Sequence, residues 1–398
     1  MVQAVILAAG KSTRTYPLTL TRPKPLLKVM NKPILAYLLD QLLECDVEET
    51  IIIDGYKKEM IRDFFGDNYK GMKLKFVEQK EQLGTLHALH QVKDYLNGRF
   101  FVLYGDDLLH AHDLKKCLDH KYAMCLMKTK YPERFGIAKV EDDRVVDIVE
   151  KPKTYIGDLA SVGGFMFDMK VFDYPLEKDE GEAEYYIPNM LRKLAKDEEI
   201  YPIIVEKYWL PTGYPWDLLN ANEVMIKELK DTVIKGEVEE NVIIKGNLIL
   251  EEGSVVKAGT YIEGNVVIGK NCIVGPSAYI KNGTVIGDGC SVGHQVTVKN
   301  SILMDNVELG HLTYVADSVI GENVIVGAGT IVANRSSDDG VIVSEHKGDN
   351  IPTGRRCFGT ILSDEVNIGV KNVIYPGKKI WPYVKTPPGK IINMDILK

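Results

Sequence analysis

Residues 262–297 read IEGNVV, IGKNCI, VGPSAY, IKNGTV, IGDGCS and VGHQVT when they are written in blocks of six. Every block begins with isoleucine or valine, and its fifth residue is small or β-branched. This period fits neither the two-residue alternation of an amphipathic strand nor the 3.6-residue turn of a helix. A fixed longer period over consecutive blocks is typical of a solenoid, in which each repeat packs only on its neighbours.

The same spacing extends on both sides of this stretch. The aliphatic positions that follow one another at intervals of six are Leu250, Val256, Ile262, Ile268, Val274, Ile280, Ile286, Val292, Val298 and Met304. We expect each hexad to supply one short strand and one corner, and three hexads to close a triangular coil. The period slips by one residue at Leu309 and Ile320, breaks over residues 335–357 and resumes at Leu362, which predicts a loop that leaves the coil. An antiparallel sandwich with regular turns is the alternative, and the unbroken run of positions disfavours it.

The chain before about residue 230 has a different pattern, in which short apolar runs alternate with segments of helical period. The runs that we expect to form strands are Val2–Leu7, Thr50–Asp54, Leu74–Glu78, Phe100–Tyr104 and Met124–Lys128, and the expected helices are Ile34–Cys45 and Leu83–Leu96. This alternation predicts an α/β domain with a mostly parallel sheet. We therefore expect one domain over residues 1–230, with a connecting helix at about 216–230, and a second over residues 236–398.

The composition excludes several classes of protein. Lys and Arg total 49 against 56 Asp and Glu, a net charge of −7, which argues against a nucleic-acid partner. The six cysteines form no Cys-x-x-Cys pair, so neither a metal site nor a disulfide framework is indicated. The start of the chain has no basic leader, and no apolar stretch approaches the roughly 20 residues of a membrane span. We expect no membrane partner and a cytoplasmic location.

A loop that could hold phosphates follows the first predicted strand. Its residues Leu7, Ala8, Ala9 and Gly10 are small enough for backbone N–H groups to approach oxygen atoms. Arg14 and Lys24 come soon afterwards and could neutralise the charge of a triphosphate. A small-residue turn can also do no more than begin a helix, so spacing alone leaves both interpretations open.

These residues carry a resemblance to the sugar-1-phosphate nucleotidyltransferases, whose sequences open with Leu-Ala-Ala-Gly-x-Gly-Thr-Arg and continue to Pro-Lys-Pro. Ser12 stands at the second glycine of that motif. The resemblance implies a Rossmann-like nucleotidyltransferase domain in which residues 7–10 bind the nucleotide. It also implies that Gln79, Gly84 and Thr85 face a pyrimidine ring, which makes UTP or dTTP the expected nucleotide.

Two aspartates match the metal-binding positions of this family. Asp106 lies in Tyr104-Gly105-Asp106-Asp107, and Asp217 lies in Gly213-Tyr214-Pro215-Trp216-Asp217. The resemblance implies that both bind Mg²⁺, an ion that prefers carboxylate and phosphate oxygens. From the residues alone, Asp106 could equally cap a helix that follows its strand.

The sugar-binding segments of the family are matched by Gly136, Glu150, Lys151 and Val162. By the resemblance Glu150 accepts hydrogen bonds from sugar hydroxyls, and Lys151 meets the phosphate of a sugar 1-phosphate. Val162 stands where enzymes for N-acetylglucosamine 1-phosphate have asparagine and where those for glucose 1-phosphate have valine. The implied reaction is in-line attack of the sugar phosphate on the α-phosphorus, with Arg14, Lys24 and Mg²⁺ stabilising charge and with no covalent intermediate.

The repeat region resembles the acetyltransferase half of the archaeal bifunctional UDP-N-acetylglucosamine pyrophosphorylase/glucosamine-1-phosphate N-acetyltransferases. The matching motif is Gly310-His311-Leu312-Thr313-Tyr314-Val315, with Asn334 farther along. It implies a left-handed β-helix, a homotrimer, acetyl-CoA as co-substrate and His311 as the general base, with Tyr314 and Asn334 in the same site. A neutral imidazole can take the proton of an attacking amine.

The loop at residues 335–357 has Asp338 and Asp339 where the related enzymes have lysines. Lys347, Arg355 or Arg356 could meet the sugar phosphate instead, while His294 and His346 are expected to be structural.

Three hypotheses follow from the sequence. The first is a bifunctional enzyme that makes UDP-N-acetylglucosamine from glucosamine 1-phosphate, acetyl-CoA and UTP. The second is a glucose-1-phosphate thymidylyltransferase or uridylyltransferase whose β-helix serves only oligomerisation. The third is a catalytically silent sugar-nucleotide sensor, which the complete set of Arg14, Lys24, Asp106 and Asp217 disfavours.

Overall fold

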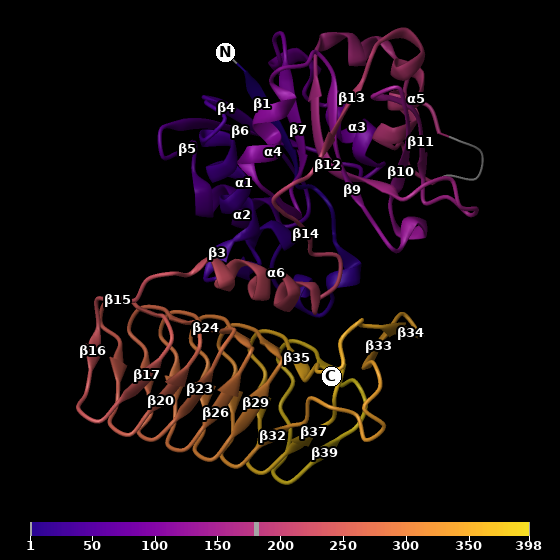
Figure 1. The fold of residues 1–398 in the computed structure, drawn as a ribbon. Coiled ribbons are helices and arrows are strands. Elements are labelled where there is room, and N and C mark those ends of the chain that lie inside the picture. Colours follow the sequence, from indigo (N-terminus) through magenta and orange to yellow (C-terminus); the bar gives the residue numbers. More distant parts are fainter. Residues whose placement is uncertain (1, 179–182, 398) are drawn as a thin grey trace. The chain divides into compact units, whose positions relative to one another are not determined.

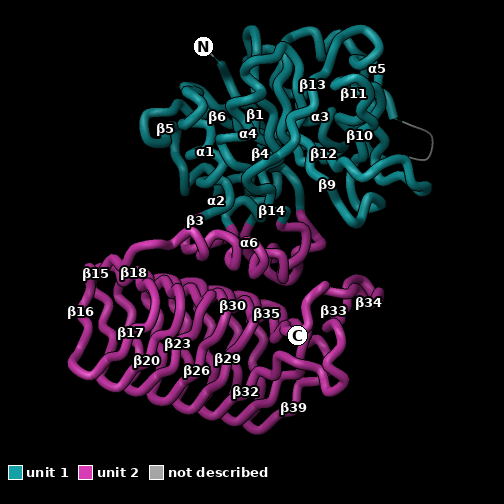
Figure 2. The backbone as a smooth tube through the Cα atoms, viewed as in Figure 1, with its two compact units in different colours: residues 1–11, 23–26, 33–211 teal, residues 12–22, 27–32, 212–398 magenta. Residues whose placement is uncertain are grey.

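The computed structural model of the protein describes residues 2–178 and 183–397, and the repeat region forms a coil in it (Figure 1). The hexad residues from Leu250 to Val298 belong to the core of this coil, whereas Met304 does not. The chain folds into two compact units (Figure 2). Unit 1 comprises residues 1–11, 23–26 and 33–211, and unit 2 comprises residues 12–22, 27–32 and 212–398. No single cut separates them, because two short segments near the amino terminus belong to the unit that contains the coil.

Unit 1 is built on a mixed sheet whose path runs β11-β10-β12-β7-β1-β4-β6-β5. Its strands are β1 (Gln3–Leu7), β4 (Glu49–Asp54), β5 (Asn68–Tyr69), β6 (Met72–Glu78), β7 (Phe100–Tyr104), β9 (Ala123–Lys128), β10 (Gly136–Glu141), β11 (Arg144–Glu150), β12 (Leu159–Phe167) and β13 (Tyr201–Ile204). Strand β1 pairs in parallel with β4 and β7, and β4 pairs in parallel with β6. Strands β10, β11 and β12 pair antiparallel, because short connections rather than helical crossovers join them.

Adjacent residues of the central strands enter different cores. Val5 packs in one cluster and Ile6 in the other, as the two-residue alternation of a strand requires. The helices of unit 1 are α1 (Ile34–Leu43), α2 (Lys58–Phe65), α3 (Thr85–His90), α4 (Ala111–Cys117) and α5 (Ile187–Asp197), with short 3-10 turns η3 (Lys24–Leu26), η4 (Lys93–Tyr95), η5 (Pro132–Arg134) and η6 (Met169–Asp173). The five predicted strands are confirmed, whereas the helix predicted over residues 83–96 is divided into α3 and η4. A small antiparallel pair, β8 (Asp107–Leu109) with β14 (Trp209–Pro211), completes the unit.

Unit 2 is a parallel β-helix of three sheets. The first contains β15 (Val233–Ile234), β18 (Leu248–Leu250), β21 (Val266–Ile268), β24 (Thr284–Ile286), β27 (Ile302–Leu303), β30 (Val319–Ile320), β35 (Thr360–Leu362) and β38 (Lys378–Ile380). The second contains β16 (Glu237–Val238), β19 (Val255–Val256), β22 (Ile273–Val274), β25 (Ser291–Val292), β28 (Glu308–Leu309), β31 (Ile325–Val326) and β36 (Asn367–Ile368). The third contains β17 (Ile243–Lys245), β20 (Tyr261–Glu263), β23 (Tyr279–Lys281), β26 (Thr297–Lys299), β29 (Tyr314–Ala316), β32 (Ile331–Val332), β37 (Val373–Ile374) and β39 (Ile391–Ile392).

The predicted register is confirmed with one correction. Ile262 lies beside Ile280 and Ile280 beside Val298, one coil apart in each case. The residue beside Ile286 is Leu303 and not Met304, so the period already slips at that point. The physical reason is a shorter corner, because Asn300 alone, with a positive φ of 44°, replaces the two residues that turn the preceding coil.

The predicted loop contains a hairpin, β33 (Val343–His346) with β34 (Asp349–Pro352). Unit 2 also contains the helix α6 (Asp217–Met225), the short turns η1 (Thr13–Thr15), η2 (Leu18–Leu20) and η7 (Ile226–Glu228), and the strand β2 (Lys28–Val29). The strand β3 (Lys32–Pro33) has its first residue in unit 2 and its second in unit 1. The predicted connecting helix corresponds to α6 and η7. In the described part of the chain, no helix combines the length and the apolar character that a membrane span needs.

Candidate functional site

The loop Leu7–Gly10 lies at the carboxyl end of β1, between the ends of its two parallel neighbours. The amide of Gly105, just after β7, donates to the Leu7 carbonyl at 2.9 Å. The Ala9 carbonyl accepts from the Gln82 side chain at 2.7 Å. Ligands of open α/β sheets bind at this edge, where parallel strands end. The position therefore fits a nucleotide-binding loop.

Lys24 and Asp106 meet at the same edge of unit 1. The Lys24 side chain is buried and its Nζ donates to Asp106 Oδ2 at 2.8 Å. The neighbouring Asp107 accepts from Trp209 Nε1 at 2.9 Å, which fixes the β8–β14 pair beside the loop. The Asp106 carboxylate is 40% exposed, so it can approach a ligand while Lys24 holds it. Its oxygen donors suit Mg²⁺.

The predicted base-reading residues lie together at the start of α3. The Gln79 side chain is buried and its Nε2 donates to the Gly84 carbonyl at 3.1 Å. Gly84 has a φ of 105°, and a Cβ atom there would lie 2.4 Å from the Tyr185 carbonyl oxygen. Thr85 Oγ1 accepts from the Ile187 amide at 3.1 Å. Only glycine fits this turn, which brings the chain around Gln79.

Tyr104, the last residue of β7, joins the predicted base, metal and sugar segments. Burial raises the pKa of its phenol, and the charge of Glu150 acts in the same direction. Thr85 lowers the pKa of the same phenol and the charge of Asp106 raises it, so groups of the base, metal and sugar segments all lie near Tyr104. The sequence motifs assign no role to Tyr104, because a tyrosine at the end of a buried strand is more often a core residue than a residue of a functional site.

The predicted sugar segments only partly come together. Gly136 pairs with Glu150 across β10 and β11, and a Cβ atom on Gly136 would lie 3.0 Å from Glu150 Oε2. Lys151 Nζ lies 3.0 Å from Glu150 Oε1, so a carboxylate and a cation stand side by side. Val162 is 2% exposed and belongs to the apolar core of the sheet. In this arrangement Val162 shapes the core beneath the site and presents little surface to a ligand.

Arg14 and Asp217 belong to unit 2. The Arg14 guanidinium lies 5.9 Å from the centre of the Tyr214 ring. Asp217 begins α6, and its Oδ2 accepts from the Tyr214 amide at 2.7 Å. The carboxylate therefore closes the turn before the helix, while its charge lies at the positive end of the helix dipole.

His311 lies at an exposed corner of the coil. Its Nδ1 accepts from the His294 amide at 3.0 Å, so the ring proton of the neutral imidazole is on Nε2. The two rings are 6.4 Å apart and His294 Nδ1 lies 3.2 Å from the Pro276 carbonyl oxygen. Among the described residues, no hydrogen bond joins His311 to Tyr314 or Asn334.

Asn334 belongs to a polar network around the buried side chain of Asp317. Its Nδ2 donates to Asp317 Oδ2 at 2.6 Å, and Asn300 Nδ2 donates to Asp317 Oδ1 at 2.7 Å. Arg355 reaches the same carboxylate at 3.8 Å and bonds to Glu223 of α6. Asp317 and Cys357 raise the pKa of Tyr314 after the larger effect of burial, which places that phenol beside the network.

Two lysines that no sequence motif identified line a cavity of about 440 Å³ on this side of the coil. Lys281 and Lys299 are neighbours on β23 and β26, one coil apart. Arg355, one of the three cations expected to meet the sugar phosphate, lines the same cavity, whereas Lys347 and Arg356 do not. The hexad register could have predicted that Lys281 and Lys299 are neighbours, because residues one coil apart lie side by side.

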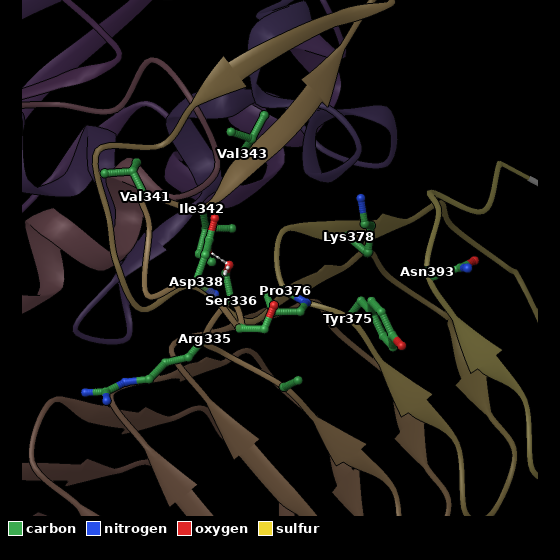
Figure 3. A pocket seen from close by; sticks show the side chains of 12 residues that line it. Arg335, Ser336, Asp338, Val341, Ile342, Val343, Tyr375, Pro376, Lys378 and Asn393 are labelled. Carbon is green, nitrogen blue, oxygen red and sulfur yellow. Dashed lines mark hydrogen bonds between the residues drawn. The ribbon is translucent and has the colours of Figure 1, made fainter.

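A larger cavity of about 730 Å³ opens between the loop and the last coils. Figure 3 shows Val341, Ile342 and Val343 on one wall and Tyr375 and Lys378 on the other. The Asp338 carboxylate accepts from the Ser336 hydroxyl and from the Gly340 amide, and these bonds lower its pKa. This acidic residue therefore caps its own turn within the wall.

The sequence model of the "Nucleotidyl transferase" family matches residues 3–228, and that of the "GMPPB C-terminal domain" matches residues 262–387. A "Bifunctional protein GlmU" of Methanocaldococcus jannaschii is 38% identical over 99% of this chain and 96% of its own length. A "Bifunctional sugar-1-phosphate nucleotidylyltransferase/acetyltransferase" of Sulfurisphaera tokodaii is 33% identical over 99% of this chain and 98% of its own.

Among solved structures, a "Putative Glucose-1-Phosphate Thymidylyltransferase" of Bacillus anthracis covers 58% of this chain and 98% of its own, with a TM-score of 0.53 and 26% identity. That match supports the nucleotidyltransferase fold of the first part of the chain, and the two relatives extend over both parts. The chain therefore belongs to the nucleotidyl transferase family and, over nearly its whole length, to the family of the bifunctional GlmU proteins.

Proposed function

We propose that the protein acetylates glucosamine 1-phosphate with acetyl-CoA and then transfers a uridylyl group from UTP to the product, giving UDP-N-acetylglucosamine and pyrophosphate. The observation that carries the proposal is the alignment of 99% of the chain with relatives named as bifunctional enzymes. A candidate site in each unit supports it: the loop edge with Lys24 and Asp106, and the coil face with Asn334 and Asp317.

In the first site the sugar phosphate oxygen attacks the α-phosphorus in line, and pyrophosphate leaves. Residues 7–10 bind the nucleotide, Lys24 stabilises the negative charge that develops, and Lys151 holds the sugar phosphate while Glu150 accepts hydrogen bonds from the sugar hydroxyls. Asp106 is the carboxylate of unit 1 that would hold Mg²⁺, which neutralises phosphate charge when bound, and the roles that the resemblance gives to Arg14 and Asp217 of unit 2 stay predictions. No side chain needs to form a covalent bond.

The pyrimidine base is recognised by the segment around Gln79. Because Gln79 Nε2 is occupied by the Gly84 carbonyl, its Oε1 is the atom that can accept from a base. Uracil and thymine both carry a donor at N3, so the segment accepts UTP and dTTP alike.

In the second site Lys281, Lys299 and Arg355 bind the phosphate of glucosamine 1-phosphate, and acetyl-CoA occupies the larger cavity beside Arg335 and Lys378. The amine attacks the thioester carbonyl and His311 takes the amine proton; the C–S bond then breaks, and coenzyme A leaves as a thiol after its thiolate takes up that proton. This role requires the His311 ring to turn away from the His294 amide, because that bond occupies the unprotonated Nδ1.

We propose that a homotrimer completes the second site, with His311 of one copy facing Asn334 of another. The separation of His311 from the Asp317 network within one chain supports this arrangement. Co-expression of His311→Ala with Asn334→Ala should restore about a quarter of the acetyltransferase sites when subunits mix at random. Two variants that stay inactive together would contradict a shared site.

The direct test is mass analysis of the products after incubation with glucosamine 1-phosphate, acetyl-CoA, UTP and Mg²⁺. Formation of UDP-N-acetylglucosamine would support both activities. We propose that both reactions take place in the cytoplasm. Formation of UDP-glucose or dTDP-glucose from glucose 1-phosphate, without acetylation, would favour the second candidate, a glucose-1-phosphate nucleotidyltransferase whose coil only assembles subunits. The likeness to the Bacillus anthracis protein favours that candidate.

A further inference from the structure

The amide of Gln79 can take only one orientation. Its Nε2 lies 3.1 Å from the Gly84 carbonyl oxygen, which can only accept a hydrogen bond. The atom of the amide that faces this oxygen must therefore be nitrogen. Gln79 is 5% exposed, so water is poorly placed to replace the bond.

His87 fixes the second hydrogen of the same amide. Its Nδ1 lies 3.0 Å from Gln79 Nε2. One N–H of the amide points to Gly84 and the other to His87, so the imidazole must accept at Nδ1 and carry its proton on Nε2. Gln91 Nε2 lies 3.3 Å from that Nε2 atom and donates to the His87 backbone carbonyl at 3.3 Å, so accepting the ring proton requires the Gln91 amide to turn over and give up the carbonyl bond. Among the described residues, the hydrogen bonds of the Gln79 side chain all use Nε2.

The histidine ring is itself held in place. His87 lies on α3, three residues after Gly84, and stacks on the Tyr185 ring with centroids 6.4 Å apart. The Tyr185 backbone donates to the Leu83 carbonyl at 2.8 Å and accepts from the Leu86 amide at 2.9 Å. The turn, the helix and the aromatic wall thus form one unit around Gln79.

We propose that His87 is a positioning residue that determines which pyrimidine the enzyme selects. By occupying the last N–H of the Gln79 amide, His87 leaves that side chain an acceptor only. An acceptor pairs with the N3–H of uracil or thymine, and it repels cytosine, whose N3 is itself an acceptor. This inference rests on the proposed nucleotidyltransferase function of unit 1 and extends it to a residue that does not touch the base.

Two substitutions separate this role from a structural one. His87→Phe keeps a ring against Tyr185 but removes the acceptor, so one N–H of the Gln79 amide becomes free to donate to another acceptor, such as N3 of cytosine, while the other still donates to Gly84. His87→Asn places a carbonyl oxygen at nearly the position of Nδ1 and keeps the acceptor. We expect His87→Phe to raise the KM for UTP about tenfold and to reduce the preference for UTP over CTP by about the same factor, with kcat within about twofold. We expect His87→Asn to stay near the wild type in both measures.

The measurement is steady-state pyrophosphate release by the full-length protein with UTP, dTTP or CTP, together with thermal unfolding of each variant. An unchanged UTP/CTP ratio in His87→Phe would overturn the inference, and so would equal losses in the Phe and Asn variants, since the ring would then matter only for packing. If the wild type releases no pyrophosphate with UTP or dTTP, the proposed function fails first, which is a different result from an unchanged ratio.

Discussion

The two units place functional groups together in different ways. In the α/β unit Lys24 and Asp106 meet although 82 residues separate them, because two loops end at one sheet edge. In the coil Lys281 meets Lys299 because each residue lies beside its equivalent in the next coil. A site on the sheet therefore depends on topology, whereas a site on the coil depends on a count along the sequence. If this difference holds, substitutions at one site should leave the activity of the other unchanged.

The largest expected effect is on the sheet-edge site. Asp106→Asn removes a charge that would hold a metal ion, and we expect the rate of uridylyl transfer to fall by about 10²–10³-fold. Acetyl transfer should be unchanged, because the proposed acetyltransferase residues all belong to unit 2. Asp107→Asn is the matched control, since its side chain can still accept from Trp209. Equal losses of both activities in Asp106→Asn would show that the sites are coupled.

A buried ion pair near the end of the coil tests how local the coil is. Lys379 Nζ lies 3.5 Å from Asp395 Oδ2, donates to the Glu345 carbonyl of the hairpin, and is 4% exposed. Lys379→Met leaves Asp395 buried without its partner and should lower the free energy of unfolding by about 3 kcal/mol. The double variant Lys379→Met/Asp395→Leu removes both charges and should recover most of that loss.

Chemical denaturation followed by circular dichroism measures this difference. Lys379→Met also removes the hydrogen bond from Lys379 to the hairpin, whose residue Val343 lines the larger cavity. We therefore expect a higher KM for acetyl-CoA in this variant. If the double variant were no more stable than Lys379→Met, the loss of stability would not come from a buried Asp395 charge without its partner.

The sequence predicted the coil better than it predicted the sheet-edge site. The hexad rule placed Ile262, Ile280 and Val298 in one column, and its error at Met304 came from a corner that is one residue shorter. No such rule connects Gln79 to His87, or Tyr104 to Thr85, since those contacts depend on how a turn and a strand end pack in three dimensions. The resemblance located the loops, and only the structure shows which side chains hold them.

The lysine pair of the coil provides a smaller effect on activity. Lys281→Met or Lys299→Met should raise the KM for glucosamine 1-phosphate about tenfold, because each removes one charged hydrogen bond to phosphate. Uridylyl transfer from N-acetylglucosamine 1-phosphate should not change. Lys245 occupies the same column, beyond Glu263 and outside the cavity, so Lys245→Met is the matched control. An equal effect of all three substitutions would mean that the coil attracts the substrate by general charge only.

The smallest effect is a difference in pH dependence between two carboxylates of the same unit. Burial raises the pKa of Asp395, whereas hydrogen bonds within its turn lower the pKa of Asp338. Above the ordinary carboxyl pKa of about 4, folded Asp395 keeps a proton that the unfolded chain has lost, so its contribution to stability falls as the pH rises. The contribution of Asp338 to stability changes with pH in the opposite direction, because it is lost as the pH falls through the lowered pKa of Asp338.

Melting temperatures of the wild type, Asp395→Asn and Asp338→Asn between pH 3 and pH 7 measure the two contributions. The advantage of the wild type over Asp395→Asn should decrease as the pH rises, and its advantage over Asp338→Asn should increase. Because Asp338 is exposed, its change should be the smaller of the two and should weaken with added salt. If both melting-temperature differences changed with pH in the same direction, burial would not control the protonation of Asp395. The loop and the coil core would then not differ in the pH dependence of their carboxylates.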